Sequence, residues 1–253
     1  IFIIENVKGI LTMKNGQVFN EIKKIFEDSN NFEGKPYKIQ YKVMKAKEFG
    51  IPQNRERTII IGSMIDFDLD EEINKTKEYI KGIDKHFFDN VTVWQAISNL
   101  PKPTEDGNIS TKKPENNYQK FLSSNSGKTF NHVMTKHNSI AVKRMEKIGI
   151  NENFTVLDEE IKTVHSGSYG RLDPDSIAPT ITTRFDTPSG GRFIHPFENR
   201  TITPREAARI QSFPDNFEFV GTKSCICKQI GNAVPPKLSY FLGTMIRRIL
   251  END

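Results

Sequence analysis

The stretch QNRERTIII, residues 53–61, joins a polar, basic segment to a run of β-branched apolar residues. Residues 58–61 have the composition of a buried strand, and Gly62 closes it. Arg55 and Arg57 are two positions apart, so on an extended backbone their side chains point to the same face. The stretch therefore predicts a buried strand whose entry carries two neighbouring guanidinium groups.

Upstream of this stretch, strand and helix patterns alternate. Residues 2–4 form a short apolar run that predicts a buried strand, and the polar Glu5 follows it. Apolar residues at helical spacing predict an amphipathic helix over 17–28, and alternation over 37–43 predicts a half-exposed strand. This order is typical of an α/β layer in which helices pack on a sheet.

Downstream, the composition changes. Residues 66–90 hold eight acidic residues and four lysines, which predicts a solvated excursion. Over 102–150 polar residues dominate and nine basic residues face four acidic ones, so we expect a domain boundary there. A proline at a first-turn position predicts a helix over 204–211, and an apolar stripe predicts a last helix over 238–250.

The overall composition excludes several classes of protein. The net charge of +4 is too small to identify a nucleic-acid binder by itself, and no apolar run approaches the roughly 20 residues that span a bilayer. Only two cysteines occur, Cys225 and Cys227, which excludes a disulfide scaffold and suits a reducing cytosol. A metal clip of these cysteines with His132 or His137 lacks the paired spacing of four-ligand sites, so we expect no metal.

Three charged residues near the strands could carry chemistry. Glu5 lies where open α/β sheets place their ligands, and a carboxyl group there can be partly desolvated and retain a proton. The alternative is a carboxylate that caps the next loop. The guanidinium groups of Arg55 and Arg57 could bind a phosphate or a carbonyl-rich base. The alternative is a solvated charged turn in which Glu56 is their local partner.

Two further motifs lie near the end of the chain. Arg205 and Arg209 share one face of the helix predicted over 204–211, which otherwise reads as a surface helix with an ion pair through Glu206. In the segment QIGNAVPP, Gly231 and Asn232 tolerate left-handed geometry, so they can form a tight turn whose amides face a ligand. The alternative is an ordinary loop before a helix.

Together, the order and spacing of these motifs resemble the cytosine-5 DNA methyltransferase family. The motifs are ENV after a strand, QNRER before a strand, REAARIQSFP, and QIGNAVPP, and they extend from the first strand to the last helix. The resemblance implies part of a Rossmann-like α/β sheet with helices, plus a smaller β- and loop-rich target-recognition domain. It also implies methyl transfer from S-adenosylmethionine to C5 of a flipped cytosine in duplex DNA, in a restriction-modification system.

The resemblance assigns roles to the motif residues. Glu5 matches the glutamate that contacts N3 of the cytosine, Arg57 matches the arginine that approaches O2, and Arg55 matches its companion in the active-site wall. The segment Asn232, Ala233 and Val234 matches residues that close the cofactor pocket.

The chain lacks two motifs of the family pattern. It has no Pro-Cys-Gln nucleophile motif and no Phe-x-Gly-x-Gly cofactor loop, both of which precede Glu5 in the family. We therefore expect the C-terminal portion of an enzyme that is inactive without a complementary N-terminal polypeptide or segment. The alternatives are a non-catalytic, sequence-specific DNA-binding module and an RNA-directed relative. For each of these alternatives we expect the protein in the bacterial cytosol or nucleoid, with no membrane partner.

The same resemblance predicts how the chain is divided. Residues 1–101 are the second half of the catalytic domain, 102–193 the target-recognition domain, and 194–253 a return segment whose last helix packs on the catalytic domain. The basic residues expected to contact DNA are Lys112, Lys113, Lys120, Lys128, Arg184 and Arg192.

Overall fold

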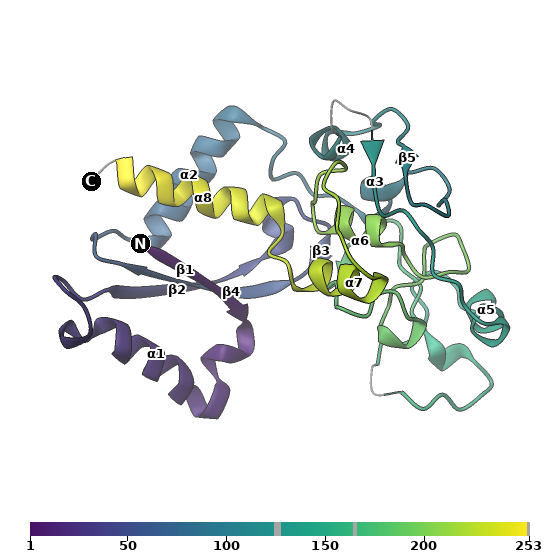
Figure 1. The fold of residues 1–253 in the computed structure, drawn as a ribbon, viewed down its shortest axis with the longest axis horizontal. Coiled ribbons are helices and arrows are strands. Elements are labelled where there is room, and N and C mark those ends of the chain that lie inside the picture. The colour runs from purple at the N-terminus through teal and green to yellow at the C-terminus, as the bar shows by residue number, and fades with distance from the viewer. Residues whose placement is uncertain (124–127, 164–165, 252–253) are drawn as a thin grey trace. The chain divides into compact units, whose positions relative to one another are not determined.

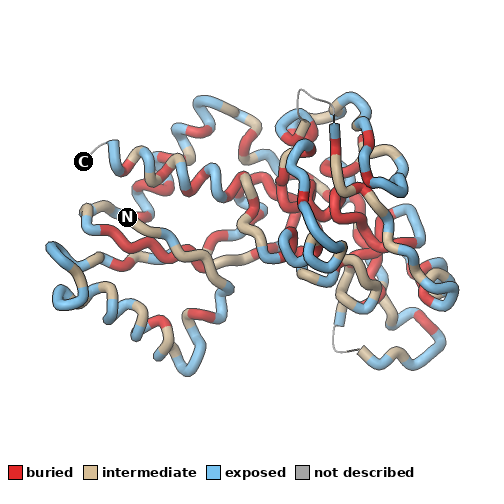
Figure 2. Tube along the Cα trace, in the orientation of Figure 1, coloured by how far each residue is buried: buried red, intermediate tan, exposed pale blue. Residues whose placement is uncertain are grey.

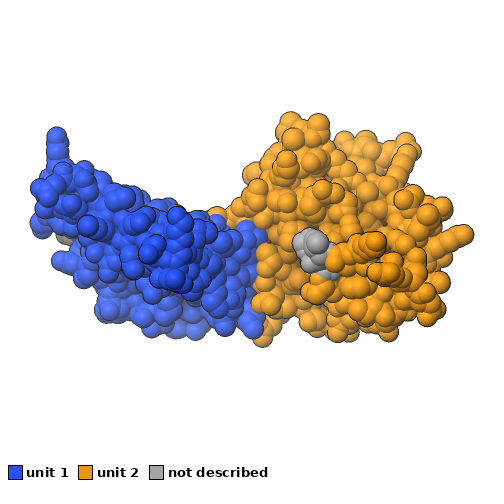
Figure 3. All heavy atoms as spheres, turned by 90° about the horizontal axis from the view of Figure 1, so that it is seen from below, with its two compact units in different colours: residues 1–49, 55–88, 237–253 blue, residues 50–54, 89–236 orange. Residues whose placement is uncertain are grey.

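The computed structural model describes residues 1–123, 128–163 and 166–251, and it divides into two units that Figure 3 colours separately. The first unit comprises residues 1–49, 55–88 and 237–253. The second comprises residues 50–54 and 89–236.

The first unit is built on a three-stranded sheet in the order β1 (Phe2–Val7), β4 (Glu56–Ser63), β2 (Lys38–Lys45), and both pairings are antiparallel (Figure 1). The central strand β4 is buried from Thr58 onwards (Figure 2). Strand β1 is longer than the sequence predicts. Its ladder with β4 continues to Val7, so Glu5 lies within the strand and not in a loop after it.

Helices complete the first unit. Helix α1 (Gln17–Glu27) confirms the predicted amphipathic helix, and its Phe19 packs against Ile39 and Ile60 of the sheet. Helix α8 (Pro236–Glu251) confirms the predicted last helix, and the ring of its Phe241 lies 4.9 Å from that of Phe49.

The prediction of a solvated excursion over residues 66–90 was wrong. Helix α2 (Leu69–Ile83) occupies most of that range, and Asp68 caps it by accepting a hydrogen bond from the backbone N–H of Glu71. Its apolar side is buried, and the rest of the helix carries both acidic residues and lysines. No described helix is both long and apolar enough to span a membrane.

The second unit consists of short elements joined by long loops. Its strands are β3 (Gln53–Asn54), β5 (Ile109–Ser110), β6 (Lys128–Thr129) and β7 (Ala178–Pro179). Its helices are α3 (Val93–Ile97), α4 (Asn117–Leu122), α5 (Ser139–Glu146), α6 (Pro204–Ile210) and α7 (Lys223–Asn232).

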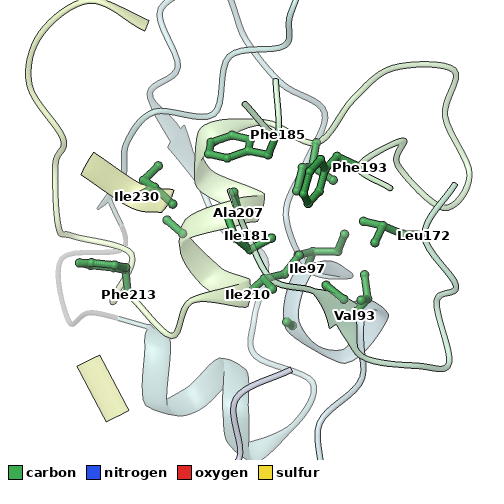
Figure 4. Packing of buried hydrophobic residues seen from close by; sticks show 14 of the residues in the cluster. Val93, Ile97, Leu172, Ile181, Phe185, Phe193, Ala207, Ile210, Phe213 and Ile230 are labelled. Carbon is green, nitrogen blue, oxygen red and sulfur yellow. The ribbon is translucent and has the colours of Figure 1, made fainter. Parts of the chain in front are cut away.

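Helix α6 runs through the main hydrophobic core of the second unit. Figure 4 shows Ala207 and Ile210 of this helix among Ile97, Ile181 and other buried side chains. Thr203 and Glu206 form a capping box at its first turn, as expected for a helix that begins at Pro204. All seven residues of α6 are buried, so the alternative of a surface helix is wrong.

The unit boundaries differ from the predicted domain boundaries. Residues 89–101 and 194–236 belong to the second unit, and only 237–253 of the predicted return segment belongs to the first. The division into compact units does not identify the residues that contact DNA. The predicted division into catalytic and target-recognition domains therefore stays a prediction.

Candidate functional site

Glu5, Arg55 and Arg57 come together on one face of the first unit's sheet. The Oε1 atom of Glu5 lies 3.0 Å from Nε of Arg57 and 3.9 Å from Nη2 of Arg55. Glu5 is directly opposite Ile59 in the antiparallel ladder, so Arg57 is its diagonal neighbour. The two arginines are two residues apart, and both reach one carboxylate oxygen. Sequence periodicity predicted this shared face.

This carboxylate and its two guanidinium groups are largely withdrawn from water. The side chain of Arg55 is 2% exposed, that of Arg57 15% and that of Glu5 18%. Burial and the neighbouring positive charge of Arg57 lower the pKa of Arg55 to about 10, against the opposing effect of Glu5. The cluster therefore offers one carboxyl group and two cationic hydrogen-bond donors to a polar ligand in a site of low solvent access.

The three residues expected to bind a cofactor lie between the last residue of α7 and the start of α8. Asn232 is exposed at the end of α7, and Val234 is half-buried in the turn before α8. Between them, the backbone N–H of Ala233 donates to the carbonyl of Ile230 and closes the helix. The structure thus places an amide and an aliphatic side chain at one turn.

The tight left-handed turn allowed for Gly231 and Asn232 is not formed, because both residues belong to the last turn of α7. Gly231 is needed for a different reason. A Cβ atom on it would lie 2.5 Å from the carbonyl carbon of Thr182 and 2.6 Å from the backbone nitrogen of Thr183. The absent side chain lets α7 pack directly on the backbone of another segment.

We expect Gly231→Ala to lower the free energy of unfolding by about 1–3 kcal/mol, because the backbone of Thr182 cannot move aside as a flexible side chain would. Gly243→Ala is the matched control in helix α8, since nothing lies within 4 Å of its Cβ position. The control is expected to gain about 0.5–1 kcal/mol. Urea denaturation of both variants measures the difference, and equal shifts would contradict the packing argument.

The lysines predicted to contact DNA are exposed in the second unit. Lys120 is on α4, Lys128 is on β6, and Lys112 and Lys113 lie between β5 and α4. The backbone of Lys112 is held in place because its N–H donates to the carbonyl of Asn99, and the side-chain amide of Asn99 donates to the carbonyl of Lys112. All four lysines are thus exposed, and the backbone of Lys112 is anchored.

The two arginines predicted to contact DNA, Arg184 and Arg192, differ in their hydrogen bonding and exposure. Arg184 is exposed, whereas the guanidinium of Arg192 donates to the backbone carbonyls of Glu152 and Arg171. Burial lowers the pKa of Arg192. Arg192 therefore joins two loops of the second unit, and its contact with DNA stays a prediction.

The helical spacing of the arginines of α6 did not by itself show that they are internal supports. Arg205 donates to the backbone carbonyls of Phe130, Pro214 and Phe217. Arg209 forms a two-pronged ion pair with Asp215 at 2.7–2.8 Å, and both side chains are at most 1% exposed. The spacing of the arginines showed a common face, but nothing local showed that this face is buried.

Glu206 is held by a third arginine. Both of its carboxylate oxygens lie 2.8 Å from guanidinium nitrogens of Arg200. Burial would raise the pKa of Glu206, but the hydrogen bonds and charge of Arg200 lower it to about 2. Glu206 is therefore ionised near neutral pH and forms a buried ion pair with Arg200.

The two cysteines lie on α7. Cys227 is buried, and burial followed by the charge of Asp186 raises its pKa to about 12. Its thiol is therefore protonated near neutral pH and is not a nucleophile there. Cys225 is exposed. Within the part of the chain that the structure describes, no group of three or more His, Cys, Asp or Glu residues is placed to hold a metal ion.

Comparison with known proteins adds to this geometry. The family model for C-5 cytosine-specific DNA methylase matches residues 1–248. The type II methyltransferase M.DdeI of Desulfomicrobium norvegicum is 31% identical over 99% of this chain, and M.NgoFVII of Neisseria gonorrhoeae is 34% identical over 94%. The chain spans only 63% and 55% of the length of these two relatives.

Solved structures show the same fold. A structure described as a prophage-encoded DNA modification methyltransferase from E. coli superposes with a TM-score of 0.71 at 24% identity, covering 99% of this chain and 69% of that one. The Dnmt2 methyltransferase of S. pombe superposes with a TM-score of 0.55 at 15% identity, covering 98% and 66%. At these identities the likeness establishes the α/β methyltransferase fold alone.

Proposed function

The chain belongs to the C-5 cytosine-specific DNA methylase family, and on this premise we propose that it supplies part of the active site of a type II DNA (cytosine-5-)-methyltransferase. The observation that carries the proposal is the convergence of Arg55 and Arg57 on Glu5. The substrate would be a cytosine in a specific duplex DNA sequence in the bacterial cytosol, flipped out of the helix because C5 and C6 are not accessible in a stacked base.

The cluster has the groups that this reaction needs. Attack of a thiolate on C6 of cytosine moves electron density toward C5, N3 and O2. We assign Glu5 to N3, where its carboxyl group hydrogen-bonds or donates a proton, and Arg57 to O2, where its guanidinium donates. Arg55 is the more buried cation and approaches the same carboxylate oxygen of Glu5 as Arg57 does, so we assign it to the wall of the active site.

The residues at the junction of α7 and α8 fit one side of a cofactor pocket. When bound, S-adenosylmethionine supplies the electrophilic methyl group. An exposed amide at Asn232 and a half-buried aliphatic side chain at Val234 suit a ligand with both polar and apolar surface. We assign Asn232, Ala233 and Val234 to holding it, in agreement with the family motif.

We further propose that the nucleophilic thiol and the glycine-rich cofactor loop come from another segment or polypeptide. The thiol of Cys227 is protonated near neutral pH, and Cys225 stands in no Pro-Cys-Gln sequence. Among the described residues, strand β1 pairs only with β4, so its other edge can accept a strand. Ile3 and Val7 of this edge strand are 37% and 51% exposed.

The test is transfer of a labelled methyl group from S-adenosylmethionine to mixed-sequence duplex DNA. The chain would be assayed alone and with the N-terminal half of a relative such as M.DdeI. We expect activity in the mixture only. Activity of the chain alone would refute the need for another segment. The non-catalytic module would be favoured if the chain binds DNA but neither sample transfers a methyl group. The two polypeptides of the mixture must then be shown to associate.

Replacing the four predicted lysines with alanine should weaken DNA binding and flatten its salt dependence. Each lost phosphate contact lowers the slope of log K against log salt by about 0.9. Fluorescence anisotropy with labelled duplex DNA between about 50 and 200 mM salt measures this slope. Lys81→Ala on helix α2 is the control, since that exposed lysine pairs with Glu78. An unchanged slope in the fourfold variant would show that these lysines do not contact DNA.

A further inference from the structure

Arg184 differs from the other arginines of the second unit. That unit contains seven arginines. Six of them have guanidinium groups that are bound to carboxylates or backbone carbonyls of the protein: Arg144, Arg171, Arg192, Arg200, Arg205 and Arg209. The seventh, Arg184, is exposed, and its guanidinium forms no hydrogen bond or ion pair with the residues that the structure describes. This guanidinium can therefore bind a partner without first breaking an internal contact.

The backbone at Arg184 is nevertheless fixed. Its N–H donates to Oγ1 of Thr182 at 3.3 Å, and its carbonyl accepts from the N–H and the hydroxyl of Thr187 at 3.2 and 3.0 Å. Gly190 packs on the same carbonyl so closely that a Cβ atom on it would lie 2.1 Å from that oxygen. Residues 184–190 therefore form a tight turn that begins at Arg184.

The segment that carries this turn is also attached to the rest of the second unit. Ile181 and Phe185, on either side of Arg184, are fully buried in the main hydrophobic core (Figure 4). Further along the turn, the carbonyl of Pro188 accepts a hydrogen bond from the N–H of Tyr169 at 2.6 Å. The backbone is thus held before and after Arg184, while the side chain of Arg184 lies in solvent.

An exposed guanidinium on a fixed backbone suits the reading of a base in DNA. The planar fork of arginine matches O6 and N7 of guanine in the major groove, which is the commonest base-specific contact. Such a contact needs its donors to be held within about 0.5 Å of the productive geometry. A phosphate contact needs less, because attraction between charges depends little on orientation, and the flexible side chains of the four predicted lysines suffice for it.

We propose that Arg184 is a specificity-determining residue, which reads a guanine of the target sequence by donating hydrogen bonds to its O6 and N7. This inference rests on the proposed function, because it requires that the second unit binds duplex DNA with a sequence preference. It also separates Arg184 from Arg192, whose guanidinium is already bound to the backbone carbonyls of Glu152 and Arg171.

The test is selection from a library of duplex DNA with a randomised central segment, followed by sequencing of the bound molecules. Wild type is compared with Arg184→Ala, Arg184→Lys and Arg247→Ala. Arg184→Lys keeps the positive charge but loses the planar fork. Arg247→Ala is the matched control, since it removes the same charge from a side chain of the first unit that is 70% exposed.

The wild-type chain should select guanine at a position where Arg184→Ala loses a preference of about 10- to 100-fold. Arg184→Lys should lose most of the same preference, and Arg247→Ala should keep it. Preferences at well-separated positions should stay as in the wild type, because contacts to different base pairs are roughly additive. Unchanged preferences at every position in Arg184→Ala would overturn the proposal.

The salt dependence of binding distinguishes a base contact from a phosphate contact. It is measured by fluorescence anisotropy on a duplex of the sequence that the wild type selects. Loss of one phosphate contact lowers the slope of log K against log salt by about 0.9. We expect Arg184→Ala to change the slope by less than half of this. A full decrease together with a retained guanine preference would identify a phosphate contact and overturn the proposal.

Failure of this inference can be distinguished from failure of the proposed function. If the complemented chain transfers no methyl group but Arg184→Ala loses the guanine preference, the methyltransferase proposal fails and the reading of guanine stands. If the wild type selects no sequence, the inference fails as well. The urea midpoint of Arg184→Ala should equal that of the wild type, since the guanidinium has no partner among the described residues. A lost preference would then not result from unfolding.

Discussion

Glu5→Gln is expected to lower the rate of methyl transfer by the complemented enzyme by about a hundredfold or more while leaving DNA binding intact. Glutamine has nearly the shape of glutamate but cannot supply a proton to N3 of the cytosine. It also removes the negative charge that faces the two guanidinium groups at 3.0 and 3.9 Å. Single-turnover transfer of a labelled methyl group measures the rate, and fluorescence anisotropy measures DNA binding.

Glu56→Gln is the matched control for this variant. Glu56 is the first residue of β4 and also pairs with cations, Lys8 at 3.3 Å and Lys45 at 3.8 Å. It is adjacent to Arg57 and lies on the other face of the strand. We expect less than about a threefold change for Glu56→Gln. Unchanged turnover in Glu5→Gln would remove Glu5 from the mechanism, and equal losses in both variants would indicate a general electrostatic effect.

Arg209→Met should lower the free energy of unfolding by about 3–5 kcal/mol, the largest effect on stability that we expect. The variant leaves the carboxylate of Asp215 buried, 1% exposed, without its cation. It also removes hydrogen bonds to the carbonyl of Ala96 and the side-chain oxygen of Asn99. Chemical denaturation followed by the fluorescence of Trp94, the single tryptophan and a residue of the second unit, measures the change.

Arg247→Met provides the comparison. Arg247 pairs with Glu251 at 2.9 Å, but the two side chains are 70% and 59% exposed. An exposed pair of this kind contributes about 0–1 kcal/mol. Adding Asp215→Leu to Arg209→Met should recover part of the loss, because no buried charge is then left unpaired. A loss below about 1 kcal/mol in Arg209→Met would show that water reaches Asp215.

The elements with strong local periodicity were predictable. Helices α1 and α8 and strand β2 follow from the spacing of their apolar residues, and helix α6 follows from the proline at its first turn, with boundaries shifted by a few residues. The shared face of Arg55 and Arg57 follows from their two-residue spacing, because side chains alternate along a strand. Each of these features depends on residues close together in the chain.

Helix α2 shows how a local signal was misread. Its acidic residues outweighed an apolar stripe formed by Leu69, Ile73 and Ile80, all of which are buried. An acidic first turn also favours a helix, since negative charge interacts well with the N-terminal end of the helix dipole. The apolar periodicity of the segment therefore indicates a helix, and its acidic net charge is compatible with one.

By itself, the sequence determined the α/β class, the strand that carries Arg55 and Arg57, and the resemblance that assigns roles to them. Only the tertiary structure decided that Glu5 lies within β1, that Gly231 packs on Thr182, and that the arginines of α6 are internal. The reason is physical. Periodicity is set by covalent geometry and is visible in neighbouring residues. Burial and contact depend on segments that are far apart in the chain, as shown by the hydrogen bond between Gln53 and Gln211, which are 158 residues apart.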